Sequence, residues 1–96
     1  MEITEVRVFP VEEEKLKGYA TITFDNCFVV RDLKIIAGTS GLFVAMPSKK
    51  RKDGKYRDTA HPLSTEMREA IEFRVLGTYR AEVAKGSGAS AGDFDS

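Results

Sequence analysis

The chain has 96 residues, of which 15 are Lys or Arg, 15 are Asp or Glu, and 42% are apolar. This length indicates one domain, and the composition excludes a wholly disordered chain, a helix of the roughly 18 apolar residues that would cross a membrane, and an N-terminal signal peptide. A single cysteine, Cys27, excludes an internal disulfide framework and a cysteine-rich zinc site, so we expect a reduced, cytoplasmic domain without metal or cofactor.

The first half of the chain predicts β-strands. Val6 and Val8 alternate with a polar residue, and residues 19–24 alternate apolar and polar side chains, which is typical of a half-buried strand. Asp25-Asn26 predicts a tight turn, after which an apolar, β-branched run extends over residues 27–36. The alternation changes phase within that run, which predicts a bulge near Arg31-Asp32.

Two further strands are expected before the helix. Residues 42–46 are all apolar, which favours a central strand buried on both faces, and Pro47 ends it. Asp53-Gly54 is a strong hairpin signal that precedes a last strand from Tyr56 to Ala60. The Gly-x-x-Gly stretch at 38–41 matches the backbone clamp of KH modules, but its position between two strands favours a β-turn.

One helix is predicted over residues 65–84, with Ser64 as its N-cap. One broad apolar face contains Met67, Ala70, Ile71, Val75 and Tyr79, whereas Phe73 and Leu76 point away from it. A helix that is apolar on two sides needs two partners, for which we expect the sheet and a second subunit. Gly77 marks either a close backbone crossing or a site without selection for helix strength.

These elements predict an α+β fold: an antiparallel sheet of about five strands followed by one C-terminal helix, in a homodimer. Residues 1–84 form the single domain, and the Gly-, Ser- and Ala-rich residues 85–96 are expected to form a flexible low-complexity tail.

The charge is unevenly distributed along the chain. Residues 1–14 carry five Glu and one Arg, whereas residues 49–58 carry six basic and only two acidic residues. The cations of this segment are Lys49, Lys50, Arg51, Lys52, Lys55 and Arg57. A basic hairpin loop can enter a groove or follow phosphates, although a solvated loop that maintains solubility is an equally good interpretation. Tyr56 is either a surface on which a base stacks or a core residue of its strand.

Other candidates for chemistry are weaker. Cys27 and His61 could form a nucleophile and its base, but we interpret Cys27 as a small hydrophobic residue that begins a strand, and His61 as a backbone cap. Catalysis is therefore not expected. Among the helix arginines Arg68, Arg74 and Arg80, only Arg74 falls within the apolar face, so it either pairs across an interface or faces a ligand.

Three segments carry a resemblance to a known family: DNCFVVRDLK at 25–34, GLFVAMPS at 41–48 and RDTAHP at 57–62. Together they resemble the SpoVG family (stage V sporulation protein G), and the similarity extends over about residues 1–84. The resemblance implies a small bacterial homodimer associated with cell septation and sporulation, in a family also described as DNA- and RNA-binding regulators. It places nucleic-acid contacts on Lys49, Lys50, Arg51 and Lys52, and less securely on Arg68 and Arg74.

Two functions from different classes follow. The first is a non-enzymatic, homodimeric nucleic-acid-binding regulator that contacts DNA or RNA phosphates through the basic hairpin loop, with no membrane partner. The alternative is a protein-interaction module at the division septum, whose unidentified septation or regulatory partners bind an exposed strand edge or the helix near Phe73 and Leu76.

Overall fold

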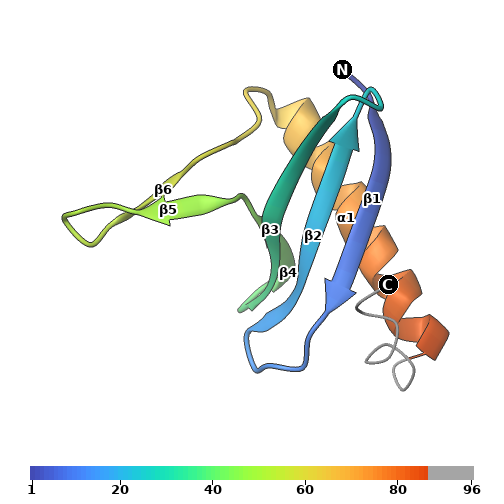
Figure 1. Ribbon diagram of the computed structural model, residues 1–96. Helices are drawn as coiled ribbons and strands as arrows, with labels where there is room; N and C mark the ends of the chain where they lie inside the picture. Colours follow the sequence, from blue (N-terminus) through green and yellow to red (C-terminus); the bar gives the residue numbers. More distant parts are fainter. Residues whose placement is uncertain (87–96) are drawn as a thin grey trace.

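A four-stranded antiparallel sheet forms the centre of the structure, a computed structural model that describes residues 1–86. Its strands are β1 (Ile3–Pro10), β2 (Leu16–Phe24), β3 (Phe28–Gly38) and β4 (Gly41–Ala45), in the order β1-β2-β3-β4. Each strand pairs with the next one along the chain, so short connections suffice. Figure 1 shows the sheet with one long helix behind it.

The junction between β2 and β3 confirms two features expected from the sequence. Asp25 and Asn26 have φ angles of 51° and 54°, as a tight hairpin turn with two left-handed residues requires, and the Cys27 N–H donates to the Phe24 carbonyl. Further along, Ala20 pairs with Leu33 but Ile22 pairs with Val30, so β3 has one extra residue there. This is the predicted bulge, and Asp32 has a φ of 67° within it.

The strand expected at the centre of the sheet lies instead at its edge. β4 pairs only with β3, and only Val44 among its residues is buried. Phe43 is 43% exposed on the face of the sheet opposite to that of Val44. The prediction of a central strand buried on both faces was therefore wrong, because a run of apolar residues can also supply an edge strand whose second face is only partly covered.

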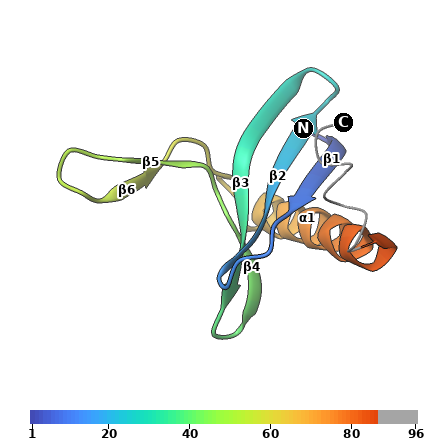
Figure 2. The ribbon, with the colours of Figure 1, turned by 60° about the horizontal axis from the view of Figure 1, so that its bottom comes forward.

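The basic segment forms a separate two-stranded ribbon. Strands β5 (Ser48–Lys50) and β6 (Tyr56–Asp58) pair antiparallel to each other and not to the four-stranded sheet. All six residues are exposed, and both views show the ribbon standing away from the sheet and helix (Figures 1 and 2). The α+β class is confirmed, with these six strands arranged as four and two rather than in one sheet of about five.

Helix α1 (Thr65–Gly86) covers one face of the sheet. Ser64 caps it as predicted, since its Oγ accepts a hydrogen bond from the Met67 N–H at 3.1 Å. Ile71 and Val75 enter a core that β1 to β4 and the following loop supply with Ile3, Val8, Ala20, Ile22, Phe24, Leu33, Ile35, Val44 and Met46. The helix continues to Gly86, beyond its predicted end at 84, and the rest of the predicted tail lies outside the described residues. No helix in residues 1–86 is long and apolar enough to cross a membrane.

The helix surface differs from the prediction at two positions. Leu76 is partly buried against the core and so does not point away from it, and Ala70 is exposed although it was placed on the core-facing side. Phe73 does point away, with 80% of its surface exposed. A Cβ atom at Gly77 would meet nothing within 4 Å, so no close backbone crossing within this chain explains the glycine.

Candidate nucleic-acid interface

The ribbon is held by hydrogen bonds at its base and at its tip. At the base, the carbonyl of Pro47 accepts bonds from the Thr59 N–H at 2.8 Å and the Thr59 hydroxyl at 3.1 Å. Near the tip, the Arg51 N–H donates to the Lys55 carbonyl at 2.7 Å, and Gly54 adopts a φ of 86°, which favours glycine. A two-stranded hairpin alone is marginally stable in water, so the ribbon depends on these hydrogen bonds and on its turn for a defined shape.

The register divides the ribbon into two unlike faces. Lys49 pairs with Arg57, while Lys50 pairs with Tyr56. Side chains of paired residues lie on one face and alternate along each strand, so the bonded pair Arg51 and Lys55 continues the face of Lys49 and Arg57. The result is a four-cation face formed by Lys49, Arg51, Lys55 and Arg57, and a mixed face formed by Ser48, Lys50, Tyr56 and Asp58.

The cations of the ribbon are not neutralised by the acidic residues near them. Asp53 uses a side-chain oxygen to accept the Lys55 N–H at 3.0 Å and so stabilises the turn. Within residues 1–86 the ion pairs are Arg7 with Glu5 and Lys85 with Glu82, and neither involves the ribbon. The like charges on neighbouring residues of the ribbon repel one another, so an anion that binds between them is stabilised electrostatically.

Three other predicted candidates are placed differently. Tyr56 is 69% exposed, so it is a surface residue of the ribbon and not part of the core. Arg68 is exposed in the first turns of α1. The Arg74 guanidinium donates to the Ile3 carbonyl at 3.1 Å, which fastens the helix to β1, the sheet edge opposite the strand that leads into the ribbon. The structure therefore brings together the six ribbon cations, while Arg74 lies apart from them.

Glu72 was not singled out from the sequence. Its carboxylate lies 3.5 Å from the Val44 nitrogen, on the strand at the other edge of the sheet from the one that Arg74 contacts. Two residues apart on the helix, Glu72 and Arg74 thus each reach a backbone group of an outer strand. No sequence signal distinguishes this anchoring from an ordinary solvated charge, because it depends on where the helix crosses the sheet.

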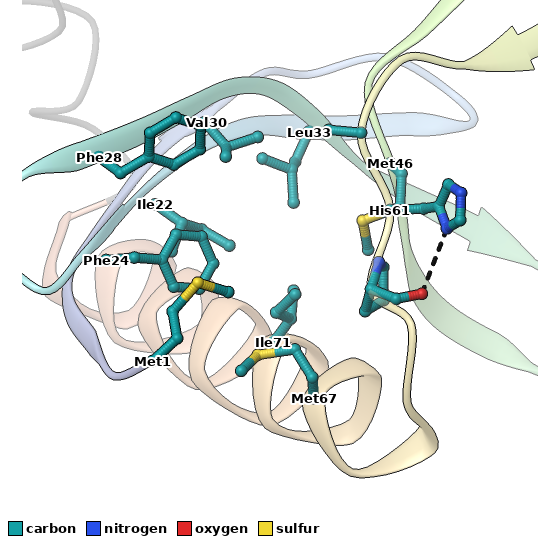
Figure 3. Close-up of a pocket in the computed structure, with 12 residues that line it drawn as sticks. Met1, Ile22, Phe24, Phe28, Val30, Leu33, Met46, His61, Met67 and Ile71 are labelled. Atoms are coloured by element: carbon teal, nitrogen blue, oxygen red, sulfur yellow. Dashed lines mark hydrogen bonds between the residues drawn. The ribbon is translucent and has the colours of Figure 1, made fainter.

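An apolar hollow of about 150 Å³ lies beside the base of the ribbon. In Figure 3, Phe24, Leu33, Met67 and Ile71 surround it, and His61 lies at the rim with its Nδ1 3.2 Å from the Pro62 carbonyl oxygen. His61 has the only ionisable side chain in this lining, so the hollow suits an apolar side chain rather than a nucleotide.

The Cys27 and His61 pair receives no structural support. Cys27 is exposed at the turn before β3, which begins at Phe28, so its interpretation as a small hydrophobic residue that begins the strand was wrong. His61 faces a carbonyl of its own loop, and within residues 1–86 no hydrogen bond joins the side chains of Cys27 and His61. Residues 1–86 also contain no group of three or more His, Cys, Asp or Glu side chains that could hold a metal ion.

Comparisons with known proteins agree with the three sequence segments described above. The family model described as SpoVG matches residues 1–81. A protein of an Anaeromyxobacter species is 66% identical over 87 residues, covering 91% of this chain and 90% of its own length. One from Bdellovibrio bacteriovorus is 65% identical (86% and 77% covered), and one from Clostridium beijerinckii is 49% identical (88% and 94% covered). All three are named "Putative septation protein SpoVG".

Proposed function

The chain belongs to the SpoVG family, and from this premise we propose that it is a homodimeric, non-enzymatic regulator that binds DNA or RNA through its basic ribbon. One observation carries the proposal: six exposed cations stand on a projecting hairpin without an ion-pair partner among the described residues. Such a surface attracts phosphates whatever the net charge of the protein, because remote acidic residues are screened over about 8 Å at physiological salt.

The mechanism is neutralisation of phosphates by Lys and Arg side chains, with release of the counterions that these phosphates held. Two protomers would present two ribbons, which increases the number of contacts without further basic residues. A regulator that acts in the cytoplasm on septation, or on sporulation where the host sporulates, is consistent with the septation role named for the relatives.

The dimer is part of the proposal. Phe73 is 80% exposed on the outer side of the helix, and a domain of about 85 residues gains stability from further apolar burial. Multi-angle light scattering at micromolar concentration should give twice the mass of the chain. A monomer mass would remove both the second helix partner and the paired ribbons.

Ultraviolet crosslinking to a radiolabelled oligonucleotide, followed by peptide mapping, tests the binding surface. We expect attachment within residues 48–58, with Tyr56 among the crosslinked residues if a base lies near it. Crosslinks confined to α1 would contradict the ribbon as the binding surface, and a protein that captures no nucleic acid would contradict the function itself.

The same exposed Phe73 favours a second candidate, a protein-interaction module that acts in septum formation without direct contact to nucleic acid. The two candidates differ in what accompanies the purified protein. A raised ratio of absorbance at 260 and 280 nm supports nucleic-acid binding. A stoichiometric protein partner that persists after nuclease treatment, and is lost with Phe73→Ser, supports the alternative.

A further inference from the structure

The two faces of the ribbon differ in charge. This difference indicates which face contacts the nucleic acid and which form of nucleic acid it suits. We propose that the four-cation face, formed by Lys49, Arg51, Lys55 and Arg57, lies in the major groove of duplex DNA, with the mixed face turned away from the base pairs. This inference rests on the proposed function and deepens it, because it names one face of the ribbon and one class of nucleic acid.

The dimensions of the ribbon fit this groove. Two paired strands lie about 4.8 Å apart, and the five residues from Ser48 to the tip at Lys52 extend about 16 Å from the base. The major groove of B-form DNA is about 12 Å wide and 8.5 Å deep, and it admits a two-stranded ribbon. The projection of β5 and β6 from the body leaves the ribbon free to enter it (Figures 1 and 2).

The side chains of the four-cation face suit what the major groove presents. Guanine offers its O6 and N7 as a pair of acceptors there, which Arg binds with two hydrogen bonds and Lys with its ammonium group. Arg51 and Arg57 are thus placed to read guanine, and Lys49 and Lys55 to contact guanine or the flanking phosphates. Since this face carries no carboxylate, it has no group suited to accept a bond from cytosine N4.

The same geometry disfavours the two competing forms of nucleic acid. In A-form RNA the major groove is too deep and narrow for side chains to read. A single strand would be bound through stacking on Tyr56, but that ring lies on the mixed face, opposite the main concentration of charge. A ribbon built for single strands would carry its aromatic residue and its cations on one face.

Lys49 and Lys50 provide a matched pair of variants, since they are adjacent, exposed and identical in charge but lie on opposite faces. Fluorescence anisotropy with a 20-base-pair duplex that contains GG steps should show Lys49→Gln weakening affinity about fivefold or more, and Lys50→Gln less than about twofold. Arg57→Gln should weaken it about tenfold, and Tyr56→Ala little. Replacement of guanine by 7-deazaguanine, which lacks the N7 acceptor, should weaken binding by the wild-type protein.

The outcomes separate this inference from the proposed function. Equal losses for Lys49→Gln and Lys50→Gln, no effect of 7-deazaguanine, or equal affinity for an RNA duplex of the same sequence would each overturn the groove model and leave phosphate binding by the ribbon intact. A large loss with Tyr56→Ala on a single-stranded probe would overturn it in favour of stacking. If wild-type protein binds none of the probes, the proposed function fails as well.

Discussion

Removal of the ribbon should abolish nucleic-acid binding and leave the rest of the protein folded. The perturbation is replacement of residues 49–57 by Asn-Gly, which joins the paired residues Ser48 and Asp58 through a two-residue turn. No residue of the ribbon contributes to the buried core, whose last member before it is Met46. The folding of the sheet and helix therefore does not depend on the ribbon for apolar burial.

The expected change in the free energy of unfolding is small because two contributions oppose each other. The connection between Ser48 and Asp58, both included, shortens from 11 residues to four. This change lowers the entropic cost of closing the connection by about 0.9 kcal/mol. The lost cross-strand pairs are exposed and each contributes about 0.2–1 kcal/mol, while the opposed like charges of Lys49 and Arg57 are unfavourable. The net change is within about 1 kcal/mol, which corresponds to a shift in Tm of at most about 4–8 °C.

Thermal unfolding followed by far-ultraviolet circular dichroism, with anisotropy titrations on the same samples, measures both quantities. Our reasoning requires a cooperative transition near the wild-type midpoint together with loss of binding. An unfolded or aggregated variant would refute it, because the ribbon would then be required for folding, for example by packing on a second subunit. Retained binding by a folded variant would refute the assignment of the interface.

Substitutions at four further positions test the packing of the fold. Gly77→Ala should raise the free energy of unfolding in urea by about 0.8–1.0 kcal/mol, since its Cβ would meet open space; a decrease, or loss of the dimer, would show that another molecule contacts this position. Ile35→Ala should cost about 2–5 kcal/mol because Ile35 is fully buried, whereas Leu63→Ala should stay within about 0.5 kcal/mol because Leu63 is 94% exposed, and similar costs would contradict the core as described. Asp32→Gly should be more stable than Asp32→Ala by about 1 kcal/mol, because φ is positive there; equal stabilities in chemical denaturation would argue against the bulge geometry.

Local features of the fold could be predicted well from the sequence. The turn at Asp25-Asn26, the bulge at Arg31-Asp32 and the Ser64 cap each depend on residues close together in the chain, so the chemistry of a few side chains is sufficient. Features that depend on distant partners were less accessible. The apolar run at 42–46 was assigned to the centre of the sheet, because nothing local indicates that the chain leaves the sheet after Pro47 to form a separate ribbon.

The candidate site shows the same division. Its six cations were identified from the uneven distribution of charge along the sequence, and the Asp53-Gly54 turn between them was also evident. The separation into two faces was missed, although the alternation of 49 and 51 against 50 was a usable signal once the turn was recognised. The bond from Arg74 to the Ile3 carbonyl spans 71 residues and could not be anticipated, since it depends on how α1 crosses the sheet.

The salt dependence of binding tests the central claim most directly. If about three cations per protomer neutralise phosphates in a dimer, a plot of log K against log salt concentration for duplex DNA should have a slope of about −5. Replacement of Lys49, Lys50, Arg51 and Lys52 by Ser should weaken binding strongly and make the slope shallower, to about −2 to −4, because Lys55 and Arg57 remain on the ribbon. An affinity and a slope unchanged by these four substitutions would contradict phosphate binding by the ribbon.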